Sequence, residues 1–528
     1  MIHVLLVCIV AASPVAAQSH VPPPDATDMR ILEVCEGILQ LFESSTDEIW
    51  SGFNLHERPF VVYRPGKWAL LLAYAGEAPG FEPYPAEWPE LTVAARLHFG
   101  RCENLAGQLV FDFPIGARRG VAIGVDSDLA GARDVTGPPF EATLLGYIVH
   151  EAFHQYQNEQ FGEMPSPSEE RYPILDAENS SLAALEMRLL ASAVDAASRD
   201  DEETCAQATK RFVAVRQLRW SEADPFVEPF ERALELREGT AKYVEVKAVA
   251  LATKARYAAH VTAERPLAEK LEGVSLAGLL AADFAARMTE GAVTPDDMPR
   301  NRVYPVAAAQ CYLLDFLEVD WKKTAQRAEG DFSYAALLRE HLDVSDNDLE
   351  RSLEEAMEIY DEEGIEAATL AQNEKYVRGF EAALAAFENK EGQRIEVTIP
   401  TNGASRSRVS HVRRWLMDGG RRSLCSAYEI YVLTLPGSRL EIRESGVLEL
   451  NHWEGCTRTA ITFTRGELEV GIDGKPTSLA DGKAIEFASI TLRAPNVTLE
   501  ASRPGTLRCT GRRVLVDLRP AVRHQGRQ

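Results

Sequence analysis

Glu141-Ala-Thr-Leu-Leu-Gly-Tyr-Ile-Val-His-Glu-Ala-Phe-His-Gln-Tyr-Gln157 is a proline-free stretch whose apolar residues recur at roughly helical spacing. This spacing is typical of an α-helix with one buried face. The apolar positions are Leu144, Leu145, Ile148, Val149 and Phe153. Two prolines precede the stretch, and a glycine and a proline follow it. The sequence therefore predicts a well-delimited helix.

Two histidines lie four residues apart in this stretch, and a glutamate follows the first. Residues i and i+4 share one helix face, about 5 to 6 Å apart at Cβ, so the imidazoles of His150 and His154 converge on one point. This spacing forms half of a catalytic zinc site. We expect Glu151 to project from the adjacent surface, where a carboxylate reaches a metal-bound water as general base. The prediction depends on further ligands downstream.

A catalytic zinc ion needs three protein ligands and one open position for water. Three downstream glutamates compete for the third place: Glu178, Glu186 and Glu238. Glu238 is the most distinctive, because it lies in a long proline-free stretch and has small neighbours that allow close helix packing. For Glu186 the alternative is a surface acid, or one that buttresses a ligand histidine. We expect one Zn²⁺ bound by His150, His154 and Glu238.

His150-Glu-Ala-Phe-His-Gln155, followed by Arg237-Glu-Gly-Thr-Ala-Lys-Tyr243, resembles the gluzincin class of zinc metallopeptidases in the peptidase MA group. The resemblance covers roughly residues 105 to 320, and aminopeptidase N-like enzymes are distant relatives. A tyrosine in a third motif of that family, Tyr-x-x-Gly-Ala, stabilises the tetrahedral oxyanion. Tyr304-Pro-Val-Ala-Ala308 occupies the corresponding place, with Ala307 where the family has glycine. The resemblance implies that Tyr304 is the oxyanion donor, and Tyr243 is the alternative.

The chain departs from those aminopeptidases in two respects. The insert between the histidine pair and Glu238 is much longer, and no Gly-x-Met-Glu-Asn segment precedes the helix. That segment binds a free amino terminus in the family, so we expect an endopeptidase or another kind of peptidase. Two alternatives remain open: a zinc hydrolase of a non-peptide bond, and an inactive zinc-binding homologue that acts through its C-terminal domain.

The order of the elements predicts an α+β fold. Strands at 107–113 and 120–125 precede the histidine helix, and we expect such a strand to pair with the backbone of a peptide substrate. The resemblance implies that residues 18–390 form a thermolysin-like zincin core, and the pattern is sheet-rich to about 140 and helical from about 141. Further expected elements are a hairpin over 60–72 and helices over 28–49, 178–197, 202–219, 230–254, 304–319 and 346–389.

Residues 391–528 change in character to short strands separated by turns. They carry 21 Lys or Arg against 15 Asp or Glu, a net charge of +6, which leaves −30 for the preceding part. We expect an all-β sandwich-like domain here. We expect its arginines at 406, 408, 413, 414, 421 and 422 either to bind an anionic surface or to form a solvated face. The predicted strands are 393–399, 427–435, 439–442, 446–450, 459–464, 468–472, 485–492 and 497–501.

The first 17 residues predict a secretory signal peptide, because an apolar run from Val4 to Ala12 ends in small residues. We expect a secreted or periplasmic protein without a transmembrane segment. In an oxidising compartment one or more disulfides are expected, most readily among Cys425, Cys456 and Cys509. The net charge of −24 disfavours a nucleic-acid partner, so the expected partner is a peptide or protein substrate.

Overall fold

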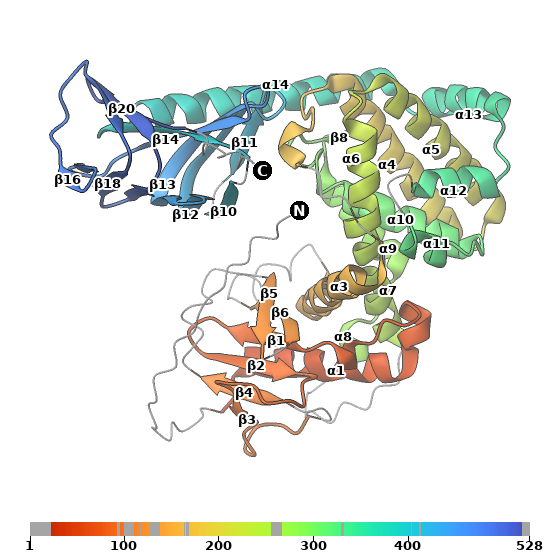
Figure 1. Cartoon of the computed structure of the whole chain (residues 1–528). Coiled ribbons are helices and arrows are strands. Elements are labelled where there is room, and N and C mark those ends of the chain that lie inside the picture. The colour runs from red at the N-terminus through yellow and green to blue at the C-terminus, as the bar shows by residue number, and fades with distance from the viewer. Residues whose placement is uncertain are drawn as a thin grey trace, which may run out of the picture. The chain divides into compact units, whose positions relative to one another are not determined.

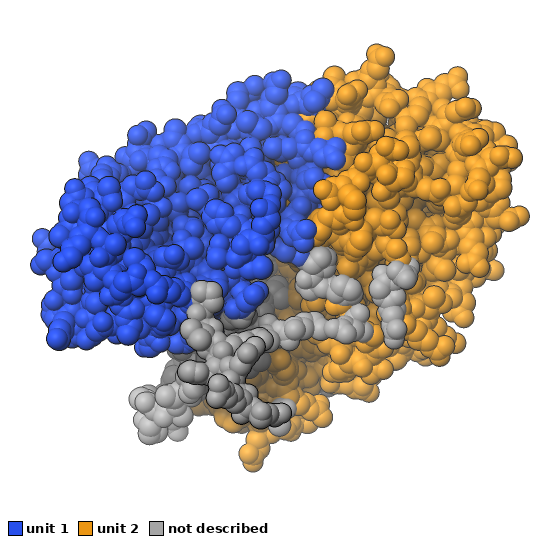
Figure 2. All heavy atoms as spheres, turned by 45° about the horizontal axis from the view of Figure 1, so that its top comes forward, with its two compact units in different colours: residues 1–14, 168–176, 370–528 blue, residues 15–167, 177–369 orange. Residues whose placement is uncertain are grey.

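The computed structural model describes residues 23–91, 95–99, 110–116, 118–125, 138–162, 164, 168–254, 267–328, 332–402, 404–410 and 413–519. The chain divides into two compact units (Figure 2). We call the described residues within 15–167 and 177–369 the helical unit, and those within 168–176 and 370–528 the strand-rich unit. The signal peptide predicted over 1–17 lies outside the described residues. Mixed helix and strand, with a strand-rich C-terminal region, confirm the α+β class.

The described strands of the helical unit form a six-stranded sheet in the order β3-β4-β2-β1-β6-β5. The expected hairpin is present, because β1 and β2 pair antiparallel around a turn at Gly66, whose φ is positive. β6 pairs parallel with β1 and antiparallel with β5, which ends the hydrogen-bonded path of the described strands. The strands are β1 (Phe60–Arg64), β2 (Trp68–Leu72), β3 (Glu82–Pro83), β4 (Arg96–Phe99), β5 (Val110–Ile115) and β6 (Arg118–Gly124).

Helix α3 (Phe140–Gln160) is the predicted histidine helix, and it lies against β6 (Figure 1). One of its faces is fixed by an aromatic cluster. The ring of Phe153 lies 5.2 Å from that of Trp50 and 5.1 Å from that of Phe53, both edge to face. Such pairs add to the hydrophobic burial of the rings. The cluster therefore fixes the orientation of α3 and with it the direction in which His150 and His154 point.

The helices predicted over 28–49, 178–197, 202–219 and 304–319 are present, and the one predicted over 230–254 is interrupted by a π-helical turn. The expected long acidic helix over 346–389 is wrong as a single element, because the chain leaves helical geometry at Tyr360. Asp361 then accepts a hydrogen bond from the Gly364 amide at the start of the next helix. The helices are α1 (Ala26–Ile49), α4 (Ala177–Ser198), α5 (Glu202–Glu222), α6 (Val227–Leu234), α7 (Thr240–Lys254), α8 (Leu267–Lys270), α9 (Leu276–Arg287), α10 (Val303–Phe316), α11 (Lys322–Gln326), α12 (Tyr334–His341), α13 (Asp346–Ile359) and α14 (Glu362–Glu388).

The strand-rich unit is built on one continuously hydrogen-bonded sheet of 13 strands. Its buried residues form one cluster that draws on both ends of the strand path, from Val470 and Ile472 to Leu507, so the sheet curves around a single core. The strands are β9 (Arg394–Pro400), β10 (Ser405–Ser410), β11 (Arg414–Met417), β12 (Arg422–Leu435), β13 (Ser438–His452), β14 (Thr457–Phe463), β15 (Glu469–Ile472), β16 (Lys475–Pro476), β17 (Ala484–Phe487), β18 (Ile490–Ala494), β19 (Val497–Ala501), β20 (Gly505–Thr510) and β21 (Arg513–Leu518).

Two strand predictions in this unit need correction. The expected strands 439–442 and 446–450 form one long strand, β13, because its residues keep pairing with β12 through a bulge. The expected strand 485–492 is two strands, β17 and β18, which pair with different partners. The two terminal strands β20 and β21 were not predicted, although both alternate buried and exposed residues.

The disulfide predicted among the C-terminal cysteines is absent from the structure. Cys425, Cys456 and Cys509 form no disulfide with one another. Each Sγ donates instead to a nearby backbone carbonyl, of Ala427, Trp453 and Gly511 respectively. These cysteines lie in three separate places: β12, the turn after β13, and β20.

Three of the six arginines of the predicted cluster pair with acids inside the strand-rich unit, whereas Arg413 and Arg421 are exposed. Arg406 and Arg408, two residues apart on β10, both donate to Glu170, and Arg406 also donates to Glu449. Both glutamates are 1% exposed. Arg414 pairs with Glu169. These three arginines are therefore internal partners of acids within the strand-rich unit.

Among the described residues, no helix combines the length and apolarity needed to cross a membrane.

Candidate metal centre

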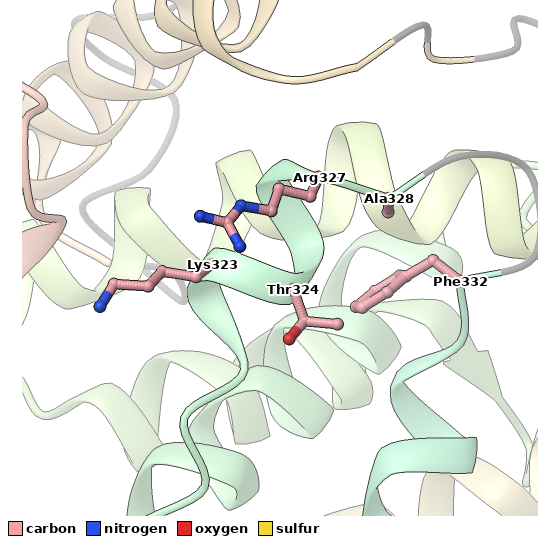
Figure 3. A pocket seen from close by; sticks show the side chains of 5 residues that line it. All are labelled: Lys323, Thr324, Arg327, Ala328 and Phe332. Carbon is pink, nitrogen blue, oxygen red and sulfur yellow. The ribbon is translucent and has the colours of Figure 1, made fainter.

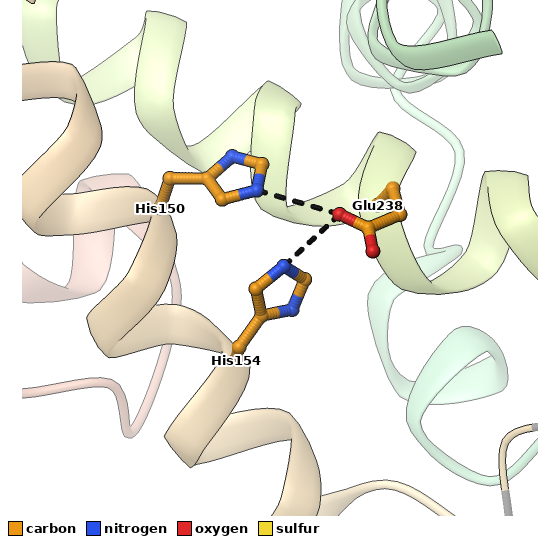
Figure 4. A group of neighbouring side chains, drawn as sticks. All are labelled: His150, His154 and Glu238. Carbon is orange, nitrogen blue, oxygen red and sulfur yellow. Dashed lines mark hydrogen bonds and ion pairs between the residues drawn. The ribbon is translucent and has the colours of Figure 1, made fainter. Parts of the chain in front are cut away.

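The structure brings His150, His154 and Glu238 together in the helical unit (Figure 4). Their ligand atoms all lie within 4.8 Å of one another. The Nε2 atoms of His154 and His150 lie 3.1 and 3.6 Å from the same atom, Oε2 of Glu238. His150 and Glu238 are buried, at 6% and 8% exposure. Three donors of the types that zinc prefers thus converge at one point.

Gln157 assigns the tautomer of His154. The Nε2 group of Gln157 donates to the carbonyls of Arg237, at 2.8 Å, and Leu236, at 3.3 Å. A carbonyl only accepts, so the amide orientation is settled and its Oε1 faces Nδ1 of His154, at 2.7 Å. Nδ1 therefore carries the proton. The lone pair of the neutral imidazole is on Nε2, which faces Glu238.

The hydrogen bond to Glu245 likewise shows which ring nitrogen of His150 carries the proton. Its Oε2 lies 3.0 Å from Nδ1 of His150, and its Oε1 accepts from Lys242 at 2.6 Å. Burial raises the pKa of Glu245, but Lys242 and the bond to His150 outweigh burial and hold the pKa at about 2. An ionised carboxylate only accepts, so Nδ1 of His150 donates. Nε2 of His150 is left to face the centre.

The two neutral imidazoles therefore direct lone pairs at an anionic oxygen, an arrangement that needs a cation. Without a metal, a bound proton supplies this positive charge. Burial lowers the pKa of His150, but hydrogen bonds to Glu238 and Glu245 outweigh burial and raise the pKa to about 9. Burial alone would raise the pKa of Glu238, yet the two histidines and Arg300 hold it far below its usual range. A divalent cation has the charge that this donor set lacks.

A π-helical turn, η4 (Glu235–Gly239), places Glu238. The amide of Thr240 donates to the carbonyl of Glu235, five residues earlier, where an α-helix would use four. The freed carbonyl of Leu236 accepts from the Thr240 hydroxyl at 2.6 Å and from Gln157. Single π turns recur at functional sites. Here the turn aims one carboxylate at the histidines.

Gly239 allows this turn to approach α10. A Cβ at Gly239 would lie 2.0 Å from the Cβ of Ala307, far inside any van der Waals contact. A similar approach occurs on the other side of the centre, where a Cβ at Gly146 of α3 would lie 2.9 Å from Cγ of Glu245. Small residues thus permit η4 to approach α10 and α3 to approach α7.

Arg300, in the segment that leads into α10, and Tyr304, in the first turn of α10, border the centre. Arg300 is half-exposed and donates to Oε1 of Glu238 at 3.1 Å, so only Oε2 faces the histidines. The ring of Tyr304 stacks on that of His150, with centroids 5.9 Å apart and planes 11° apart. Burial and the Glu238 charge raise the pKa of Tyr304 above its ordinary value. Its hydroxyl therefore stays protonated and able to donate.

Glu151 follows His150 on α3 and is half-buried. It contributes to the negative field on His150. The group of possible metal ligands does not include it.

The alternative residues for the third ligand and for the oxyanion donor lie away from the histidine pair. Glu186 is fully buried and pairs with Arg216 and Arg219, so it neither faces the histidines nor supports one of them. Glu178 is exposed at the start of α4. Tyr243 donates to Asp315 and accepts from Lys247, so its hydroxyl is engaged away from the centre.

Sequence reasoning missed Gln157, Glu245 and Arg300. A signal existed for two of them. Gln157 lies three residues after His154, and Glu245 lies seven after Glu238, so each shares a helix face with a predicted ligand. Arg300 lies outside regular structure, and nothing in its local sequence points to Glu238.

A cavity of about 350 Å³ lies elsewhere in the helical unit (Figure 3). Lys323, Thr324, Arg327, Ala328 and Phe332 line it, on α11 and the segment that follows. None of the predicted site residues lines this cavity.

Comparison with protein-family models, with curated proteins and with solved structures finds no match to this chain.

Proposed function

We propose that the chain is a zinc-dependent metallopeptidase. The observation that carries the proposal is the convergence of His150, His154 and Glu238, with both histidine tautomers held so that Nε2 faces inward. Two imidazoles and one carboxylate form the donor set of catalytic zinc in several peptidases. Carboxylate and amide partners behind the ligand imidazoles are typical of such sites.

We assign the chemical roles as follows. When bound, zinc supplies Lewis-acid activation of water and of the scissile carbonyl. Glu151 takes the proton of the attacking water and passes it to the leaving amine. Tyr304 donates to the oxygen that becomes negative, and loss of one such donor costs about a hundredfold or more in rate in other enzymes.

The sheet supports a peptide as substrate. β5 ends the hydrogen-bonded path of the described strands, and its neighbour β6 contacts the histidine helix. An extended peptide pairs with such an edge through backbone hydrogen bonds. Together with the helices that follow, this arrangement is the basis for proposing a thermolysin-like core for the helical unit.

The test is a peptidase assay on Glu151→Gln, combined with metal analysis. The substitution removes the base but no ligand, so we expect about one zinc per chain and proteolysis reduced by at least about a hundredfold. Glu178→Gln, which neutralises an exposed acid, is the matched control and should keep wild-type activity. Unchanged proteolysis in Glu151→Gln would exclude Glu151 as the base.

A further inference from the structure

Six charged side chains are buried together behind the metal centre. Three are glutamates and three are arginines, so their charges balance, and each side chain is at most 2% exposed. We call this group the buried ionic network. Its members are Glu186, Arg216, Arg219, Glu231, Glu235 and Arg302.

Glu186 of α4 is the middle of the network. Its two carboxylate oxygens accept from Nε and Nη2 of Arg216, both at 2.8 Å, which is a bidentate pair. The same oxygens accept from Arg219, at 2.6 and 3.2 Å. Both arginines lie on α5, so this part of the network joins α4 to α5.

Two arms extend from these arginines toward the centre. In the first arm, Nη1 of Arg216 donates to Oε1 of Glu235 at 2.6 Å. In the second arm, Nη1 of Arg219 donates to Oε1 of Glu231 at 3.0 Å. Arg302 donates to that same oxygen of Glu231.

Each arm ends beside a residue of the candidate centre. Glu235 opens the π turn that contains Glu238. Arg302 directly precedes α10, between Arg300, which donates to Glu238, and Tyr304, which stacks on His150. One buried network therefore holds both segments that approach the histidine helix from the opposite side.

Stability alone does not explain such a network. Desolvation of buried charges offsets most of their attraction, and apolar residues of similar volume are often as good or better. What fixed, bidentate charge pairs add is a defined relative placement of the elements they join.

We propose that Glu235 and Arg302 are positioning residues for two different functions of the centre. Glu235 acts through Glu238 and sets metal affinity. Arg302 acts through Tyr304 and sets the rate of the chemical step. The inference rests on the proposed function, because it takes Glu238 as a ligand and Tyr304 as the oxyanion donor.

The variants are Glu235→Ala and Arg302→Met, and each leaves its partner with an opposite charge. Arg216 keeps its bidentate pair with Glu186, and Glu231 keeps Arg219. Both variants should therefore fold. Asp195→Ala and Arg199→Met are matched controls, because they make the same charge changes in an exposed pair of the same unit.

The readouts are zinc affinity, measured by competition with a chelator, and kcat and KM at saturating zinc. For Glu235→Ala we expect zinc affinity to fall by about tenfold or more, with kcat recovered once zinc saturates. Glu235→Gln keeps an acceptor for Arg216 and should restore the affinity. For Arg302→Met we expect kcat to fall by about tenfold or more, while zinc affinity and KM stay within about twofold.

If the network has only a structural role, each variant should lower thermal stability. Zinc affinity and kcat would then either stay unchanged or shift together in each variant. Either result overturns the proposal. Arg302→Met combined with Tyr304→Phe should be no slower than Tyr304→Phe alone, because Arg302 acts through that hydroxyl. Additive losses would contradict this route. If the wild type binds zinc but cleaves no peptide, the proposed function fails. The measurement of zinc affinity in Glu235→Ala still tests the role of Glu235 in that case.

Discussion

At the scale of single residues, the partners of the two histidines decide the chemistry of the centre. Gln157 and Glu245 each accept from an Nδ1 and so direct Nε2 inward. The spacing of the histidine pair was readable from sequence, because a helix imposes it. The pairing of His150 with Glu245 was not, since the two residues lie 95 apart in the chain. Only the packing of α7 on α3 determines which acid arrives there.

Replacing Glu245 by glutamine should weaken zinc binding by at least about tenfold. The amide is a poorer acceptor for Nδ1 of His150 and leaves the Lys242 charge less balanced. Chelator competition measures the affinity. Glu178→Gln serves as control, and an affinity within twofold of wild type in Glu245→Gln would show that His150 needs no acidic partner.

At the scale of elements, the π turn is the main feature that sequence periodicity did not reveal. The proline-free stretch predicts one continuous helix over 230–254, and the structure has α6, η4 and α7 in its place. A π turn differs from an α turn by one extra residue, so the apolar pattern barely changes. The Thr240 hydroxyl supports the freed carbonyl locally, but the other contacts are tertiary, because Gln157 donates to that carbonyl and Gly239 lies against Ala307.

Gly239→Ala should lower the free energy of unfolding by about 1–3 kcal/mol, because the new methyl group overlaps that of Ala307. Urea denaturation measures the loss. Adding Ala307→Gly removes the overlapping methyl and should recover most of it. If Gly239→Ala is as stable as the wild type, the close approach of η4 to α10 is not present in solution.

At the scale of the whole molecule, composition located the change to strands but not the full extent of the strand-rich unit. The charge pattern changes near Glu391, whereas the compact units divide inside α14. Tyr376 of α14 accepts from the Leu416 amide, and Phe387 packs on Phe463. Residues 168–176 join the same unit through Glu170, whose arginine partners lie more than 230 residues later. Local sequence contains no signal for such a contact.

The stability of the strand-rich unit should depend on pH through Glu170. Burial raises the pKa of this acid, but Arg406, Arg408 and Arg458 outweigh burial and hold it at about 2, below the ordinary 4.5. A depressed folded-state pKa stabilises the fold above the unfolded value, and this contribution is lost as pH falls toward 2. The difference in stability between the wild type and Glu170→Gln should therefore be largest above about pH 4.5 and should disappear as the pH falls toward 2.

Hydrogen exchange measures this difference in stability. The exchange of residues 394–518 is followed in the full chain across this pH range. Glu454→Gln, which removes an exposed pair with Arg421, should show no such trend. A constant gap between wild type and Glu170→Gln at every pH would mean that Glu170 does not titrate as its arginine partners require.

The most direct test of the metal centre is the zinc content and zinc affinity of Glu238→Gln beside the wild type and Glu178→Gln. The wild type and Glu178→Gln should each bind one zinc ion per chain. Glu238→Gln removes the only carboxylate in the described ligand group and should lose most of that affinity. One tightly bound zinc ion in Glu238→Gln, at wild-type affinity, would contradict the assignment of Glu238 as the third ligand.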